Sequence, residues 1–545
     1  MTLSWIHHLI LLPIVLPLVC GAALIPLHMS RHQLKFALSM GALLAQAGVA
    51  VALLVLADAE YWPDGIGVYL AANWAAPFGI ALVVDRLAAM MLLLAAIIGI
   101  AALLFSLVRW SRTGVHFHSL FQFMLMGING ACLTHDLFNL FVFFEVMLAA
   151  SYGLVLHGYN VARIRAGMQY IAINLVASLL FLIGLAMIYA TAGTLNMADL
   201  AGRVASLGSD ESSLLTIGIT VLAIAFLTKS AMWPFGFWLP TTYSVASPPV
   251  AAMLVLMTKV GVYVVLRVWL LVFSKDAGAV AGFGYEVLFW GGIVTIVFGA
   301  IGMLASEAPG RLAGYGAIVS SGILLAVVGY GQASLVAAGL FYLLGSTMAM
   351  AAFMLLIELI ERIRTPGSTL LAVTMEAFGI EDAPGEAVGI GIPGSLAFLG
   401  LGFAGCAMII AGLPPLSGFV GKFSLFHALL QPGPAESQVG LMSWVLLALI
   451  LVSGMAATIS LMRFGVRTLW AQGAVTPPRL LVSEATPIGL LLLLCVMLTI
   501  AAGPVFAYLG RTVDTLHRPT DYVERVLSAT TIPGPVVPAR TGAGR

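Results

Sequence analysis

The sequence predicts an all-α, polytopic membrane protein with about fourteen transmembrane helices. Hydrophobic residues make up 61% of the 545 residues and charged residues only 9%, and the mean hydropathy is +1.08. Soluble domains are about 45–50% apolar and about one quarter charged, so this composition excludes a soluble globular enzyme. The formal net charge of +1 offers no basic surface to nucleic acid, and we expect membrane lipid to surround the chain.

Fourteen apolar runs predict the spans. A hydrocarbon core of ~30 Å needs about 20 apolar residues per helix, and none of the runs alternates like a barrel strand. The runs are residues 6–27, 36–57, 79–108, 118–134, 137–157, 166–191, 214–239, 247–273, 284–305, 312–330, 333–360, 396–430, 440–470 and 485–509. The first run lacks a positively charged start and a small-residue cleavage site, so we expect a retained span and not a signal peptide.

The spans group into five expected segments. Residues 1–115 carry the first three spans, 116–275 a first repeat half, 280–470 a second repeat half, 471–510 a C-terminal span, and 511–545 a polar tail that is expected to be disordered beyond about residue 530. Lysines and arginines follow the odd-numbered spans one, three, five, eleven and thirteen, whereas the loops after spans two, four, ten and twelve have none. The odd-numbered loops are therefore predicted to be cytoplasmic, although Arg511, Arg518 and Arg525 in the tail argue mildly against this orientation.

Two spans are interrupted in a similar way. The seventh reads LTKSAMWPFGFWLP, with Lys229 five residues before Pro234, and the twelfth reads AGLPPLSGFVGKFSLF, with Lys422 after Pro414 and Pro415. Proline removes a helical hydrogen bond and glycine loosens the backbone. Paired interrupted helices in corresponding halves indicate an inverted-repeat transporter with its sites near mid-membrane. An ordinary proline kink is the alternative for either segment alone.

Four charged residues inside apolar spans are singled out as candidates: Glu145, Lys229, Lys259 and Lys422. A charge at mid-bilayer costs at least ~2.5–3.5 kcal/mol, so each is a candidate functional residue. Glu145 and Lys229 are the natural partners, because an unpaired buried charge bears its full desolvation cost. Burial disfavours a charged lysine and a nearby carboxylate favours it, so a buried lysine can load and release a proton, which arginine cannot.

Other charged residues have less distinctive positions. Arg267 is expected to snorkel from its helix end to the interface, and Glu358 is expected to pair with Arg362 four residues later. Asp85 with Arg86 opens span three, and His135 with Asp136 opens span five; they either line a proton entrance or simply mark the interface.

Metal and cofactor chemistry is not expected. The four cysteines (Cys20, Cys132, Cys406 and Cys495) are scattered in apolar runs without CxxC spacing, and His116 and His118 have no further ligand nearby. We therefore expect small core cysteines, with no metal site and no disulfide.

At the intramembrane charges the sequence resembles a known family. The segments concerned are DLFNLFVFFEVMLAASYGL, INLVASLLFLIGLAMIYATAGTLNMADLA, LTKSAMWPFGFWLP, MTKVGVYVVLRV and AGLPPLSGFVGKF. They resemble the antiporter-like membrane subunits shared by Mrp-type (Pha-type) multisubunit monovalent cation/proton antiporters and respiratory complex I, over residues 70–470. GTLNMADLA, MTKVGVY and GLPPLSGFVGKF look most like the D-type subunits of Mrp antiporters.

The resemblance implies roles for particular residues. The family's proton-translocating glutamate and lysines match Glu145, Lys229, Lys259 and Lys422. Where D-type relatives are expected to carry a histidine just before Ser-Thr, this chain has Gly345. If that histidine normally links Lys259 to Lys422, water or the hydroxyls of Ser346 and Thr347 must replace it here.

The resemblance also implies a function. We expect one component of a multisubunit Na⁺/H⁺ or K⁺/H⁺ antiporter in the bacterial inner membrane, without bound cofactor or enzymatic activity, assembled with components of the A, B, C, E, F and G types. One alternative is a proton-pumping component of a respiratory complex I or a membrane hydrogenase. Another is a structural component whose proton route has been lost at Gly345.

Overall fold

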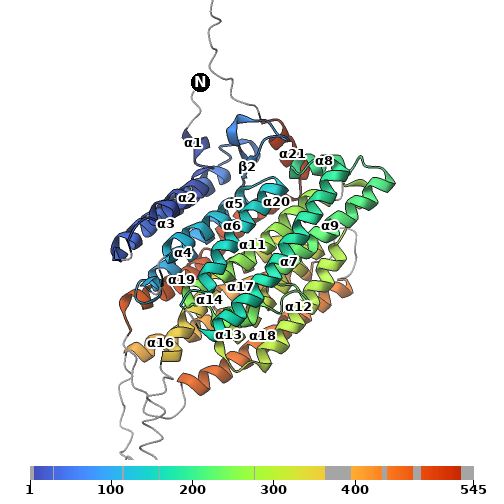
Figure 1. The fold of residues 1–545 in the computed structure, drawn as a ribbon. Helices are drawn as coiled ribbons and strands as arrows, with labels where there is room; N and C mark the ends of the chain where they lie inside the picture. The colour runs from blue at the N-terminus through green and yellow to red at the C-terminus, as the bar shows by residue number, and fades with distance from the viewer. Residues whose placement is uncertain are drawn as a thin grey trace, which may run out of the picture.

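The computed structural model describes residues 5–529 except 29, 113, 115, 159, 275–276, 363–393, 432–438 and 470–479. Within these residues the chain forms a bundle of roughly parallel and antiparallel helices (Figure 1). Twelve helices are long and apolar enough to cross a membrane, and two shorter apolar helices, α2 and α5, complete the fourteen predicted spans. The predicted all-α, polytopic fold is confirmed.

The spans follow one another along the chain. They are α2 (Leu12–Leu24), α3 (His32–Asp58), α4 (Arg86–Ser106), α5 (Phe117–Leu133), α6 (Leu137–Val155), α7 (Val161–Ala192), α9 (Ser209–Lys229) with α10 (Leu239–Val245), α11 (Pro248–Val272), α12 (Tyr285–Ala305), α13 (Pro309–Tyr330), α14 (Ala333–Glu361), α16 (Gly394–Ala411) with α17 (Ser417–Leu429), α18 (Leu441–Leu469) and α19 (Val482–Ile500). Five spans from α5 to α11 and five from α12 to α18 have the same order, and the fourth span of each set is divided in two. Helix α11 is buried over nearly its whole length and forms the centre of the bundle with α13 and α14.

The N-terminal spans show how a proline is accommodated in lipid. Pro17 inside α2 has no N–H to bond the carbonyl of Pro13. The side-chain amide of Asn129 on α5 donates to that carbonyl at 2.8 Å and to the Gln46 side chain of α3 at 3.0 Å. The freed backbone group is thus satisfied from neighbouring helices, as the membrane interior requires.

A small hairpin precedes the third span. Strands β1 (Gly67–Leu70) and β2 (Ala81–Val84) pair antiparallel, with Gly67 opposite Val84. The span predicted from residue 79 therefore begins as a helix only at Arg86, where the Asp85 carboxylate accepts from the Ala88 N–H at 2.8 Å and caps α4. The hairpin lies at the same end of the bundle as α8 (Met197–Val204) and the C-terminal helix α21 (Pro519–Leu527) (Figure 1). By the distribution of lysine and arginine this end is the predicted outer face.

Both predicted helix breaks are present. Helix α9 ends at Lys229, Ala231 has a φ of +58°, the Trp233–Pro234 peptide is cis, and α10 begins at Leu239. In the second break α16 ends at Ala411, Gly412 has a φ of +83°, the Pro414–Pro415 peptide is cis, and α17 begins at Ser417. Neighbouring groups satisfy freed backbone atoms; for example, the Trp233 N–H donates to the Thr295 hydroxyl at 2.9 Å.

The C-terminal region contains two helices that were not predicted from the sequence. Helix α20 (Ala502–Leu516) continues α19 after a break at Ala501, and α21 follows it. Residues 511–529, expected as a polar tail, therefore belong largely to packed helices. The prediction of disorder beyond about residue 530 lies outside the described residues.

Candidate functional site

Four separate helices carry the charged residues predicted inside the membrane. Glu145 lies on α6, Lys229 ends α9, Lys259 is in the middle of α11, and Lys422 lies on α17. The three lysines are buried, each with no more than 6% of its surface exposed, and Glu145 is half-buried. We refer to these four residues as the charged line.

Glu145 and Lys229 interact without direct contact. The carboxylate of Glu145 accepts a hydrogen bond from the Ser178 hydroxyl of α7. The buried ammonium of Lys229 lies 5.3 Å from the centre of the Phe144 ring and has no hydrogen-bond partner among the described residues. Glu145 nevertheless acts on it electrostatically. The predicted pair of Glu145 and Lys229 is therefore not in direct contact. A buried ammonium without a hydrogen-bond partner is costly, so we expect water to bind the Lys229 ammonium.

Lys259 has direct polar partners on the second repeat half. Its ammonium donates to the Ser320 hydroxyl at 2.8 Å and to the Ser321 hydroxyl at 3.4 Å, both on α13. The Ser320 hydroxyl lies 3.1 Å from the Ser346 hydroxyl of α14. Hydroxyls both donate and accept, so these contacts form a buried polar connection across three helices. Thr347 is not part of it, since its hydroxyl donates to the Leu343 carbonyl of its own helix at 2.5 Å.

Lys422 lies at the second break. Its ammonium donates to the carbonyls of Ala411 at 2.8 Å and Ile410 at 3.3 Å, which are at the C-terminal end of α16. The end of a helix leaves carbonyls unpaired and carries a partial negative charge. The break in the twelfth span thus frees the carbonyl groups that bind the Lys422 ammonium.

Gly345 makes room for the second broken helix. A β-carbon at this position would lie 3.1 Å from the Ser417 hydroxyl and 3.4 Å from its β-carbon. The Ser417 hydroxyl is buried and has no hydrogen-bond partner among the described residues. In the part of the chain that the structure describes, no hydrogen bond continues from Ser346 to Lys422. The connection predicted through Ser346 and Thr347 is therefore incomplete without water.

His135 and Asp136 have partners that hold the outer face together. Asp136 caps α6 by accepting from the N–H groups of Phe138 and Asn139, both at 2.9 Å, although burial raises the pKa of its carboxyl. Burial and the nearby Arg267 lower the pKa of His135 to about 3, so its ring is neutral at physiological pH. Its Nδ1 lies 2.6 Å from the Tyr522 hydroxyl of α21.

Arg267 does not snorkel to the interface as predicted. It is buried, and its guanidinium donates to both carboxylate oxygens of Asp85, at 2.6 and 2.8 Å. The reason is that Asp85, at the start of α4, lies beside the end of α11 and offers a bidentate partner within the protein. The predicted pair of Glu358 and Arg362 is confirmed at 2.8 Å, and Arg362 also reaches Glu484 at 2.7 Å.

A polar cavity of about 320 Å³ lies at the opposite end of α11. Charged and polar residues of its wall include Arg109, Arg163, Tyr243 and Glu358. The Tyr243 hydroxyl bonds the Thr258 hydroxyl, which is on the residue directly before Lys259. The loops of Arg109 and Arg163 are predicted to be cytoplasmic, so this cavity lies at the predicted cytoplasmic end of α11.

Comparisons with known proteins agree with this arrangement. Residues 134–380 match the family model described as NADH:quinone oxidoreductase/Mrp antiporter, TM. A protein of Rhizobium meliloti (strain 1021), named as the D-type subunit of a probable K(+)/H(+) antiporter, is 51% identical over 531 residues, which cover 96% of this chain and 98% of the relative. This chain belongs to the family of D-type Mrp antiporter subunits.

A further relative and a solved structure fit this assignment. The D-type subunit of a Na(+)/H(+) antiporter of Alkalihalophilus pseudofirmus is 33% identical over 527 residues, covering 96% of this chain and 99% of the relative. A chain from the solved structure of the Mrp complex of Dietzia sp. DQ12-45-1b superposes with a TM-score of 0.81 at 25% identity, covering 96% of this chain and 100% of that chain. The similarity to the D-type relatives and to this chain of an Mrp complex thus extends over nearly the whole length of the protein.

Sequence reasoning missed the hydroxyl groups that surround the charged line of this D-type subunit. These are Ser178, Ser320, Ser321, Ser417 and the pair Tyr243 and Thr258. The available signal was polar residues within apolar spans, such as the Ser-Ser pair in AIVSSGILL. Serine is common enough in membrane helices that its position alone did not distinguish a relay from helix packing.

Proposed function

We propose that this chain is the proton-translocating D-type subunit of a multisubunit monovalent cation/proton antiporter driven by the proton motive force. The observation that carries the proposal is the buried contact of the Lys259 ammonium with Ser320, which continues to Ser346 across α11, α13 and α14. A structural lysine in lipid would be expected to reach an interface or a carboxylate. Lys259 instead contacts neutral groups that can pass a proton.

The proposed route uses the charged line. Protons reach it from the polar cavity and move between Lys229, Lys259 and Lys422, and the Glu145 carboxylate is the acidic group of the route. Water bridges the interval between Ser346 and Lys422, where the unpartnered hydroxyl of Ser417 is available to orient it. Each lysine has a different environment, so a small rearrangement can change which one holds the proton. The chain is accordingly a component of a transporter, without covalent chemistry of its own.

The relatives favour potassium as the exchanged cation. The relative that is 51% identical is named for K⁺/H⁺ exchange, and the one that is 33% identical is named for Na⁺/H⁺ exchange. We propose that the complex sits in the bacterial cell membrane and that this chain assembles there with components of the A, B, C, E, F and G types. The cation need not pass through this chain.

Everted vesicles that carry the whole complex test the proposal. A respiratory ΔpH is established, K⁺ or Na⁺ is added, and dissipation of ΔpH is followed. We expect K⁺ to dissipate ΔpH at a lower concentration than Na⁺, and a stably assembled Lys229→Ala variant to lose the response. A response to neither cation, or normal exchange by Lys229→Ala, would refute the proposal.

A second candidate function is proton pumping in a redox complex, because the matching family description also names NADH:quinone oxidoreductase. It would use the same residues, driven by electron transfer in partner subunits. Genes for iron–sulfur and flavin proteins beside the gene of this chain would favour the second function, and genes for small antiporter components the first.

A further inference from the structure

Helix α11 carries a polar stripe from Lys259 towards the predicted outer face. Lys259, Tyr263 and Arg267 follow one another at intervals of four residues and therefore lie on one side of the helix. The guanidinium of Arg267 donates to the Tyr263 hydroxyl at 3.2 Å, and that hydroxyl donates to the Cys132 carbonyl at 2.6 Å. This stripe is the shortest path along α11 from the charged line to the outer end of the bundle.

A buried cluster occupies the end of the stripe. Arg267 binds both carboxylate oxygens of Asp85, and the two side chains are 8% and 5% exposed. The ring of Tyr522 lies 5.5 Å from the guanidinium, and the Tyr522 hydroxyl contacts His135 at 2.6 Å. We call Asp85, Arg267, Tyr522 and His135 the outer cluster. Three separate parts of the chain close over Arg267 in this way.

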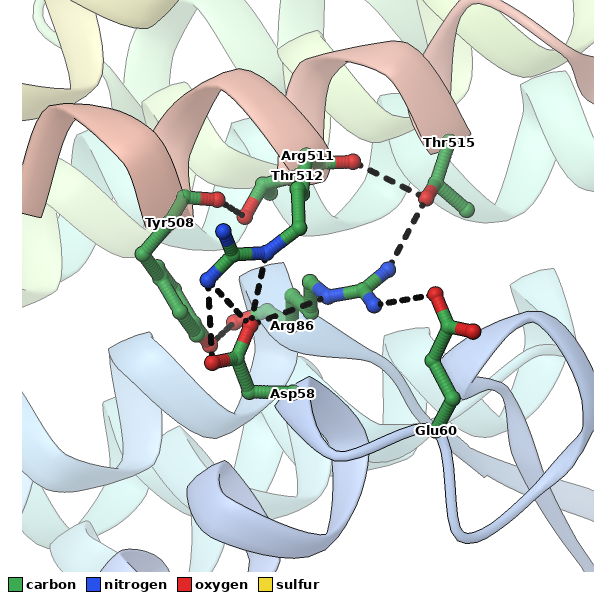
Figure 2. A network of polar contacts seen from close by, with 7 residues as sticks. All are labelled: Asp58, Glu60, Arg86, Tyr508, Arg511, Thr512 and Thr515. Carbon is green, nitrogen blue, oxygen red and sulfur yellow. Dashed lines mark hydrogen bonds and ion pairs between the residues drawn. The ribbon is translucent and has the colours of Figure 1, made fainter. Parts of the chain in front are cut away.

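Polar contacts beside the cluster attach α20, the helix that precedes α21 (Figure 2). Arg86, the neighbour of Asp85, bonds Glu60 at 2.9 Å and Thr515 of α20 at 3.3 Å, and it lies 3.4 Å from Asp58. Arg511 of α20 binds both carboxylate oxygens of Asp58, at 2.8 and 3.0 Å. A further ion pair, between Arg525 and Asp64, joins α21 to the hairpin region at 2.7 Å.

We propose that the outer cluster is a seal that closes the outer end of the first repeat half to protons. An arginine stays charged at any physiological pH and cannot pass a proton on, and its ion pair with Asp85 keeps that carboxylate from accepting one. Asp85 is occupied by Arg267, and the Nδ1 of His135 is occupied by Tyr522. The Nε2 of His135 has no hydrogen-bond partner among the described residues, but burial keeps this ring neutral at physiological pH, so the cluster disfavours the passage of a proton past Arg267.

The seal makes the access to Lys259 one-sided. At the predicted cytoplasmic end the polar cavity of about 320 Å³ reaches Tyr243, whose hydroxyl bonds Thr258 next to Lys259. At the outer end the cluster is packed and buried. Asp85, Arg267 and Tyr522 then determine which face Lys259 communicates with. This role rests on the proposed function, in that Lys259 carries protons.

The accessibility of Cys132 tests the seal independently of transport. This thiol is 1% exposed and lies on the inner side of the cluster. In the whole complex, with Cys20, Cys406 and Cys495 replaced by alanine, a charged methanethiosulfonate is applied from the face that carries α21. We expect Cys132 to be protected, and Tyr522→Ala to increase its labelling rate about tenfold or more. Thr520→Ala on the same helix is the control and should leave it protected.

Rapid labelling of Cys132 with Tyr522 in place, or continued protection in an assembled Tyr522→Ala complex, would overturn the seal. A second measurement follows passive proton leak into proteoliposomes in the absence of exchangeable cation. Tyr522→Ala should raise the leak, and adding Lys259→Met should abolish the increase. If Tyr522→Ala speeds the labelling of Cys132 but causes no proton leak, the cluster is a seal, and the proposed function, in which Lys259 carries protons, is contradicted. A leak that persists with Lys259→Met would overturn the role of the cluster in guarding Lys259.

Discussion

At the scale of single residues, the partners of Lys259 distinguish it from an ordinary buried charge. No carboxylate bonds its ammonium among the described residues; instead it donates to Ser320 and Ser321. A hydroxyl can accept a hydrogen bond on one side and donate one on the other. Proton transfer at this site therefore depends on the serine hydroxyls, and the amino-acid composition does not reveal their role.

Ser320→Ala removes the nearest partner of Lys259 and the contact to Ser346. A hydrogen bond to a charged group is worth about 1.5–3 kcal/mol, so we expect cation-driven proton transport to fall about tenfold to a hundredfold. Ser320→Thr should retain most of the activity because it keeps a hydroxyl. Ser424→Ala, whose hydroxyl only bonds the Val420 carbonyl of its own helix, is the matched control. Equal transport by Ser320→Ala and the control would contradict the relay.

Gly345→His, which would restore the histidine that the family resemblance leads one to expect, should instead weaken the complex. The new β-carbon would lie 3.1 Å from the Ser417 hydroxyl, and overpacking of this kind costs about 1–3 kcal/mol. Thermal inactivation of the purified complex should begin at a lower temperature. Combining the change with Ser417→Gly should recover part of the loss. A Gly345→His complex as stable as the wild type would contradict this prediction and would show that α17 can move away from the new side chain.

His135 gives a pH dependence of stability with a defined sign. Its pKa is lowered from 6.5 to about 3, chiefly by burial, so the unfolded chain binds the proton more readily than the folded chain. The contribution of His135 is therefore complete above pH 6.5 and decreases as the pH falls from 6.5 towards 3, by at most about 1.4 kcal/mol per pH unit. We therefore expect the melting temperature of the wild type to fall more between pH 8 and pH 5 than the melting temperature of His135→Gln. Parallel pH profiles would contradict the burial of a neutral ring.

At the scale of elements, glycine sets how closely α11 approaches the first broken helix. A β-carbon on Gly261 would lie 2.9 Å from the backbone carbonyl carbon of Lys229 and from the amide nitrogen of Ser230. Backbone at the end of α9 cannot move aside as a flexible side chain would. The close packing of MTKVGVY against the break thus depends on this residue.

Gly261→Ala should accordingly destabilise the complex by about 1–3 kcal/mol and reduce transport with it. Gly48→Ala in α3 is the control, since a β-carbon there meets nothing within 4 Å; it should be neutral or slightly stabilising, by about 0.5–1 kcal/mol. The inactivation temperatures of the two purified variants give the comparison. A loss in Gly48→Ala as large as that in Gly261→Ala would point to a general effect of glycine replacement.

The elements themselves were largely predictable from sequence. Long apolar runs specify spans because lipid requires about 20 apolar residues in a row, and the prolines at 234, 414 and 415 marked both breaks. The hairpin before α4 was missed because its residues are as apolar as a helix. The ordered α20 and α21 were missed because their stability comes from contacts distant in sequence, such as Arg511 with Asp58. Arg267 was misplaced for the same reason, since only the fold brings Asp85 to it.

The candidate site was predictable in part. The cost of charge in lipid identified Glu145, Lys229, Lys259 and Lys422 without any structure, and their roles remain predictions. Which of them are in contact was not predictable, because direct pairing of Glu145 with Lys229 and the serine partners of Lys259 depend on the relative rotation of helices. Sequence periodicity does not determine that rotation when a helix such as α11 is apolar on every side.

At the scale of the whole molecule, the two ends of α11 differ. One end reaches a polar cavity through Thr258 and Tyr243, whereas the other is closed by the outer cluster and held by α20 and α21. A transporter needs such a difference, since a line open at both ends would dissipate the gradient that drives exchange. The family membership, the fold and the polar contacts all favour an essential step at the middle of α11.

The most direct test of this account is the proton flux driven by a K⁺ gradient in proteoliposomes containing the purified complex, followed with a pH-sensitive dye inside the vesicles. The wild type is compared with Lys259→Met, which keeps the length and apolar character of the side chain but cannot carry a proton. With normal assembly of both complexes, we predict a flux in the variant below about a tenth of the wild-type value. A Lys259→Met flux equal to that of the wild type would contradict the account.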